Sequence, residues 1–230
     1  MPAPDNSPQQ VLVTHATLAG LTPLIPIPLL DDLFYRHFLR SLVKRLAATH
    51  ARELSPQEIE ILTAQKGRGC ALGCLGTVLL YPIKKVLRKI FFFLEWKRAA
   101  DTISHTYYFG YLIEAALEEG WIETHGADRV RAAIDDVLAR TNTSLITRAA
   151  SGVVGQSKGV LQSLGQLLLR NLPNAGGRAG EAEVSQASAA VEDEDRLRGF
   201  VNRLQSAIAA LPAEHFQQLR GELARELERL

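Results

Sequence analysis

Few residues of this chain combine the types and spacing that catalysis or metal binding requires. Cys70 and Cys74 lie four residues apart, but zinc needs four ligands and the sequence near them has no second cysteine pair and no His-rich tract. The six histidines show no pairing at a spacing of four residues, and no Gly-x-Ser-x-Gly motif is present. We therefore predict no metal site, no cofactor and no enzymatic activity. A pocket that brought His105, Tyr107 and Tyr108 together would argue against this prediction.

The densest chemical feature is a basic segment, residues 66–98, which joins an apolar run to a group of aromatic residues. It holds eight basic residues and one acid, a net charge of +7 in a chain whose net charge is +1. Positive charge beside apolar surface suits an anionic membrane. We therefore predict that this segment binds anionic lipid. The residues to which we assign lipid contact are Lys84, Lys85, Arg88, Lys89, Phe91, Phe92 and Trp96.

A second interpretation of the basic segment stays open. It would be a buried helix whose basic edge faces water, with the Lys and Arg stems covering apolar surface. Nucleic acid is a weaker candidate, because the aromatic residues lie in an apolar run rather than among the cations, and the pI is only 7.8. We predict no nucleic-acid partner.

The elements that position these residues are predicted to be helices. Gly69 to Ile83 carries no charge, but a helix of that length spans only about 22 Å against roughly 30 Å of hydrocarbon. A membrane crossing there is therefore not expected, and Pro82 would kink the helix. Helical spacing and capping signals predict helices over Val11–Leu21, from Asp31 or Asp32 to about Arg52, after the Ser55-Pro56-Gln57-Glu58 start signal, over Ala99–Glu119 and Ala127–Arg140, and within Thr143–Leu172.

Composition divides the chain into four parts. Residues 1–10 are polar and Pro-rich, which predicts disorder, and residues 11–172 form the helical main domain. Residues 173–191 have the composition of a flexible linker, and residues 192–230 form an amphipathic helical hairpin. Residues 181–230 carry ten acids and six arginines, so this tail is acidic. Two short helices rarely stand alone, so the hairpin either docks on the main domain or pairs with another chain. The residues assigned to self-association are Phe216, Leu219, Leu223 and Leu227.

Localisation follows from the termini and the cysteines. Residues 1–10 contain no Lys or Arg, so the positive start of a secretory signal is missing. Two cysteines four residues apart suit a reducing compartment. The excess of Arg over Lys and the abundance of Ala indicate a GC-rich bacterial genome. We expect a cytoplasmic protein bound peripherally to the inner membrane.

One segment resembles a known family. Ile25-Pro26-Ile27-Pro28, followed by Asp31 and an amphipathic helix, is similar to the start of the YcjF-like helical domains of bacterial proteins. The similarity covers residues 16–55. The glycine-rich hydrophobic hairpin that follows in that family is matched only weakly here, at Gly69–Gly76 and Gly152–Gly165, and no GTPase motif is present. The resemblance implies an all-helical, membrane-linked protein and transfers no catalytic residue.

The sequence thus predicts an all-α protein, an irregular multi-helix bundle with a C-terminal helical hairpin. The leading functional hypothesis is that the protein is a non-enzymatic peripheral membrane adaptor or scaffold. The alternative is a soluble helical interaction module that self-associates through the hairpin and has no membrane contact.

Overall fold

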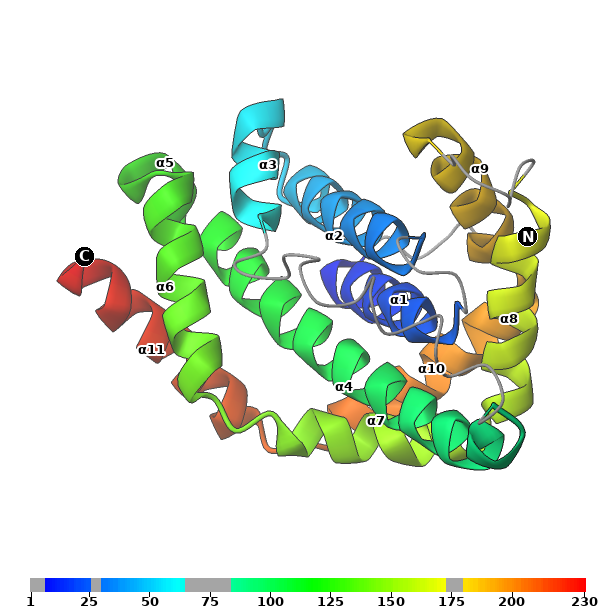
Figure 1. The fold of residues 1–230 in the computed structure, drawn as a ribbon. Helices are drawn as coiled ribbons and strands as arrows, with labels where there is room; N and C mark the ends of the chain where they lie inside the picture. Colours follow the sequence, from blue (N-terminus) through cyan, green and yellow to red (C-terminus); the bar gives the residue numbers. More distant parts are fainter. Residues whose placement is uncertain (1–6, 26–29, 65–83, 173–179) are drawn as a thin grey trace.

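The computed structural model describes residues 7–25, 30–64, 84–172 and 180–230, and of residues 84–94 it describes the helix alone. Within those ranges the protein consists of eleven α-helices and one 3₁₀ turn, without a strand, which confirms the predicted all-α fold (Figure 1). The helices are packed around α1, which lies in the middle of the molecule.

The central helix α1 spans Pro8–Leu21 and is followed by the 3₁₀ turn η1, Thr22–Leu24. Ser7 caps it by accepting a hydrogen bond from the Gln10 amide, and Pro8 occupies the first turn, where its missing N–H costs nothing. The prediction of disorder over residues 1–10 is therefore wrong from Ser7 onward, because this cap starts the helix. Ten of the fourteen residues of α1 are buried, and the helix packs on α2, α4 and α10.

The helices α2, Leu30–Thr49, and α3, Pro56–Thr63, follow the predicted positions closely. Ser55 and Glu58 form a reciprocal capping box: the Glu58 amide donates to Ser55 Oγ at 3.2 Å and the Ser55 amide donates to Glu58 Oε2 at 2.7 Å. The predicted segment Gly69–Ile83, with Pro82, lies outside the described residues.

The longest element is α4, which runs over 35 residues from Lys84 to Glu118. We predicted a separate helix from Ala99, but nothing around that residue breaks the backbone hydrogen bonding, so the helix continues through it. Gly120 ends the run in the left-handed conformation, with φ of 70°, which glycine adopts without a steric penalty. The short helix α5, Trp121–His125, and α6, Ala127–Arg140, come next. The helix predicted over Ala127–Arg140 is confirmed to the residue.

The apolar stretch after α6 forms two helices, α7 over Ser144–Gln156 and α8 over Lys158–Arg170, which meet at Ser157. Residues 181–191, predicted as part of a linker, instead belong to the helix α9, Glu181–Glu192. The reason is a stripe of small buried side chains that packs on α2 and α8. They are Val184, Ala187, Ser188 and Val191.

The last two helices are α10, Asp195–Ala209, and α11, Ala213–Arg229. They are joined through residues 210–212, but they do not pack along each other: α10 lies against α1, α7 and α8, and α11 lies against α6 and α4. Docking on the main body was one of the two outcomes that the sequence left open. The buried hydrophobic residues form one cluster, from Val11 to Leu227, so the core does not divide at the predicted boundary between main domain and hairpin.

Candidate functional site

The predicted lipid-binding segment is the first part of α4. This helix begins at Lys84 and continues without a break into the core of the molecule. Of the seven residues assigned to lipid contact, only the Trp96 side chain is described. The other six, Lys84, Lys85, Arg88, Lys89, Phe91 and Phe92, lie in the part of α4 whose side chains are outside the description, so their assignment stays a prediction.

Trp96 lies in the hydrophobic core and is only 5 % exposed. Together with Ala99, Ala100 and Ile103 it makes a buried stripe at helical spacing, and this stripe faces the neighbouring helices of the core. The indole ring is therefore covered by the protein's own residues, which is not the position that lipid contact requires. The next two residues, Lys97 and Arg98, are both exposed, so the described cations of the basic segment do face solvent.

A tyrosine–histidine pair joins α4 to α11. Tyr108 is fully buried, and its Oη lies 2.8 Å from Nε2 of His215. Beside it, Tyr111 Oη donates to the Phe216 carbonyl at 3.1 Å. Burial raises the pKa of Tyr108 to about 12, so the phenol stays protonated at neutral pH. These hydrogen bonds hold α11 in place; His105, also considered in the sequence, is exposed.

The residues assigned to self-association lie at the same joint. Leu219, Leu223 and Leu227 are buried in the core of their own chain, where α11 meets α6 and α4. The ring of Phe216 packs at 5.3 Å, centroid to centroid, from Tyr111. The three leucines are thus already covered within one chain and Phe216 is partly covered, and self-association through them stays a prediction.

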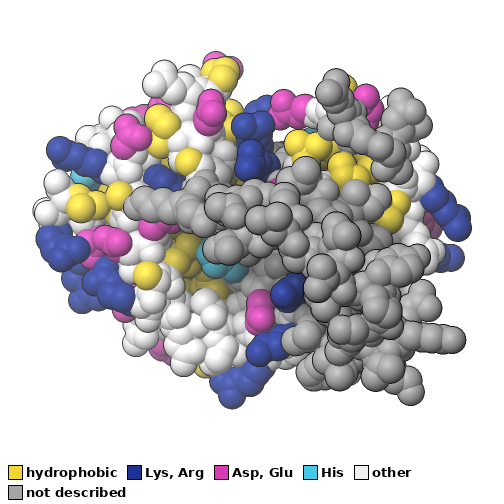
Figure 2. Space-filling model, in the orientation of Figure 1, with side chains coloured by type: hydrophobic (Ala, Val, Ile, Leu, Met, Phe, Trp, Pro, Cys, Tyr) yellow, Lys and Arg dark blue, Asp and Glu magenta, His cyan; other side chains and the backbone are white. Residues whose placement is uncertain are grey.

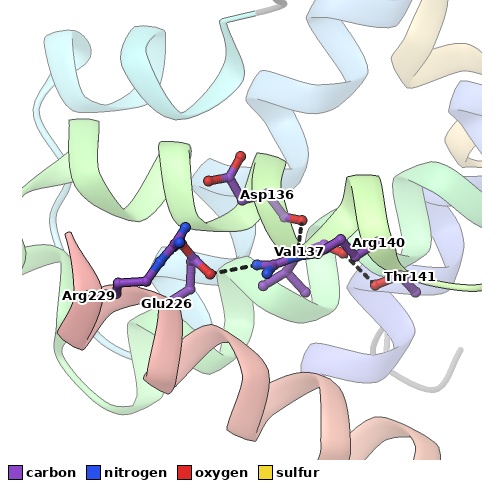
Figure 3. Close-up of polar contacts among 6 residues, drawn as sticks. All are labelled: Asp136, Val137, Arg140, Thr141, Glu226 and Arg229. Atoms are coloured by element: carbon purple, nitrogen blue, oxygen red, sulfur yellow. Dashed lines mark hydrogen bonds and ion pairs between the residues drawn. The ribbon is translucent and has the colours of Figure 1, made fainter.

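A buried carboxylate fixes the other end of α11 (Figure 3). The Glu226 side chain is 6 % exposed and receives hydrogen bonds from Arg140 Nη2 at 2.5 Å and from Arg229 Nε at 2.9 Å. Arg140 also donates through Nε to the Asp136 carbonyl at 3.0 Å. The hydrogen bonds from Arg140 and then Arg229 lower the pKa of Glu226, which therefore stays ionised. The sequence offered no signal for this cluster, because Glu226 and Arg140 are 86 residues apart.

A second interhelical contact joins α2 to α9 through ion pairs. Arg40 Nη1 lies 2.8 Å from Glu181 Oε1, and Arg45 Nη2 lies 2.5 Å from Glu192 Oε2. The sequence analysis did not identify these pairs, which join residues more than 140 positions apart. The available signal was the charge of residues 180–195, which contain six acids and no basic residue.

The described surface offers little for small-molecule chemistry. A shallow depression at the bend between α7 and α8 is lined by Gln156, Ser157, Gly159, Val160, Ser163 and Arg196. It contains no pair of titratable groups that could exchange a proton with a ligand. In the described ranges no three His, Cys, Asp or Glu side chains come close enough together to hold a metal ion, and Cys70 and Cys74 lie outside those ranges.

The surface is also mixed in charge. Lys and Arg side chains are distributed around the described rim of the face in Figure 2 rather than gathered in one patch. Among the large hydrophobic side chains whose exposure is described, only Leu230 is exposed. None of the helices in the described part of the chain combines the length and the apolar character needed to cross a bilayer.

Comparison of the chain with protein-family models, with curated proteins and with solved structures gave no match. The resemblance of residues 16–55 to YcjF-like domains therefore stays a prediction.

Proposed function

We propose that the protein binds anionic membranes peripherally, through the first part of α4, and serves there as a non-enzymatic adaptor or scaffold. The observation that carries this proposal is the continuity of α4 from Lys84 to Glu118. Because the helix is unbroken, the exposed side of its described part fixes the helical register of the preceding residues.

The register indicates where the apolar positions of the segment fall. Lys97 and Arg98 mark the solvent side of α4 where it enters the core. Position 94 lies three residues before Lys97 and four before Arg98, so it shares their side of the helix. Positions 90 and 87 lie one and two turns before position 94, so they share that side as well. The residues at these positions are Leu87, Ile90 and Leu94.

The cationic positions fall on a different side of the same helix. Positions 85 and 89 are in register with Trp96 but lie two to three turns before it, ahead of the point where this side of α4 enters the core; position 88 lies beside position 85, and position 84 lies closer to the apolar side. An apolar side in register with solvent and a cationic side across from it are the pattern of a helix that lies in a membrane interface.

The energetics favour binding only when the lipid is anionic. Each cation near an anionic surface contributes about 1 kcal/mol, and each fully buried Leu or Ile side chain contributes roughly 1.5–3 kcal/mol. The electrostatic part weakens with salt, because the Debye length is about 8 Å at physiological ionic strength. We therefore expect that membrane binding needs both the electrostatic attraction of the cations and the burial of the apolar side chains.

The non-enzymatic role is supported by what three buried or half-buried polar groups of the described part do. Tyr108, His215 and Glu226 are engaged in holding α11 against α4 and α6. The soluble, self-associating alternative gains no support from a hairpin whose apolar residues are already packed within one chain.

Vesicle flotation tests the proposal. We expect the protein to float with vesicles that contain phosphatidylserine and not with neutral vesicles. A variant with the four cations reversed should lose most of this binding. The substitutions are Lys84→Glu, Lys85→Glu, Arg88→Glu and Lys89→Glu.

A matched control reverses four exposed cations on α6, α7, α8 and α10, and so changes the net charge equally. Its substitutions are Arg129→Glu, Arg148→Glu, Lys158→Glu and Arg203→Glu. This control should bind vesicles that contain phosphatidylserine more strongly than the α4 variant does. Equal recovery on neutral and anionic vesicles, or equal losses in the two variants, would contradict the proposal.

A further inference from the structure

The outward side of α2 carries a row of cations. Arg36, Arg40 and Lys44 follow one another at a spacing of four residues, with Arg45 beside them, and three of these four are exposed. Like charges at this spacing repel each other along a helix. The row is therefore stabilised by any anionic group that lies across it.

In the folded chain that group is α9. Glu181 and Glu192, at the two ends of α9, pair with Arg40 and Arg45 at 2.8 Å and 2.5 Å. The pairs bridge 141 and 147 residues of sequence, so they are tertiary contacts rather than helix-local ones. Two acids of the run of residues 180–195 thus lie against two of the four cations of the row.

The hold of α9 on the body is weaker than that of the other C-terminal helices. Its buried side is made of small residues, Val184, Ala187, Ser188 and Val191, whereas α10 buries Leu197, Phe200 and Leu204. Small side chains remove less apolar surface from water, so detaching α9 costs less than detaching α10. Exposed ion pairs add little to this, because water and salt screen them.

We propose that α2 is a second anionic-lipid-binding surface and that α9 is its built-in acidic cover, displaced when the protein meets an anionic membrane. The inference rests on the proposed membrane function and adds a regulated contact to it. Lipid phosphates take the place of the Glu181 and Glu192 carboxylates on Arg40 and Arg45. The cover keeps the basic row neutralised away from the membrane.

The test is a lipid titration of the double variant Glu181→Gln, Glu192→Gln. Each exposed ion pair is worth a factor of about two to five, so removing both pairs should lower the anionic lipid concentration at half-saturation by roughly four- to twenty-five-fold. The control Asp128→Asn, Glu228→Gln removes two exposed acids from α6 and α11 and changes the net charge equally. A shift no larger than that of the control would overturn the inference.

Hydrogen exchange gives an independent readout on the wild-type chain. The amides of α9 should exchange faster on phosphatidylserine vesicles than in solution or with neutral vesicles, while those of α10 stay protected. Unchanged or slower exchange in α9 would also overturn the inference.

The two proposals can fail separately. If the wild type floats and the α4 charge reversal abolishes binding, but α9 neither opens nor alters affinity, only the cover is refuted. If neither the wild type nor the α9 variant binds anionic vesicles, both proposals are refuted.

Discussion

His15 is a fully buried histidine on the central helix. Its Nδ1 lies 2.8 Å from the Val11 carbonyl and its Nε2 lies 3.1 Å from Ser41 Oγ on α2. Burial lowers the pKa of His15 to about 4, against the weaker opposing effect of the Val11 carbonyl, and the nearby Arg45 and His37 lower it further. The imidazole therefore ties α1 to α2 in its neutral form.

This histidine should make the fold sensitive to acid. Above pH 6.5, the pKa of histidine in the unfolded chain, His15 is neutral in both the folded and the unfolded protein. Between pH 6.5 and pH 4 the unfolded chain binds a proton at His15 and the folded chain does not. The free energy of unfolding should therefore drop by about 2 kcal/mol between pH 7 and pH 5 from this group alone. Urea denaturation at the two pH values measures it. The variant His15→Gln should lose this part of the pH dependence and the control His125→Gln should keep it; equal slopes in all three proteins would refute the assignment.

At the scale of elements, α1 and α4 approach each other so closely that Gly20 has no room for a side chain. A Cβ built at Gly20 would lie 2.3 Å from Ile103 Cγ1 and 3.2 Å from the Ala99 carbonyl oxygen. The contact holds the central helix against the long helix that carries the proposed membrane segment.

Gly20→Ala should therefore destabilise the protein by about 1–3 kcal/mol, as overpacking does in other cores. Chemical denaturation measures the change. In the background of Ile103→Ala the cost of Gly20→Ala should shrink, because the closest atom is gone. Gly152→Ala on α7 is the control: no atom lies within 4 Å of its Cβ, so it should be neutral or stabilise by up to about 1 kcal/mol. Equal effects of the two glycine substitutions would contradict the packing described.

The elements differ in how far the sequence predicts them. The start of α3 and the bounds of α6 were predictable, because a capping box and a strong amphipathic pattern are local signals. The helix α9 was not, since its Ala- and Ser-rich stripe has the composition of a linker until α2 and α8 cover it. The burial of Trp96 could not be predicted either, because it depends on which side of α4 packs against α1, and the sequence of α4 alone does not determine that.

At the scale of the whole molecule, the C-terminal helices complete the core rather than form a separate module. Phe200 and Leu204 on α10 and Leu223 on α11 belong to the same buried cluster as α1. The sequence pattern identified the apolar sides of these helices, but not the surfaces that cover them, because those contacts join residues far apart in the chain. With its described hydrophobic residues covered in this way, the body leaves the apolar part of the proposed lipid contact to the start of α4.

The most direct measurement of the central claim is the environment of α4 on a membrane. An environment-sensitive fluorophore is attached through Ile90→Cys, or through His105→Cys as the control, in a chain that also carries Cys70→Ser and Cys74→Ser. Both positions belong to the same unbroken helix, and His105 is exposed. With phosphatidylserine vesicles, the emission at position 90 should shift to the blue and that at position 105 should stay close to its value in buffer. No shift at position 90, or equal shifts at both positions, would contradict membrane binding through the start of α4.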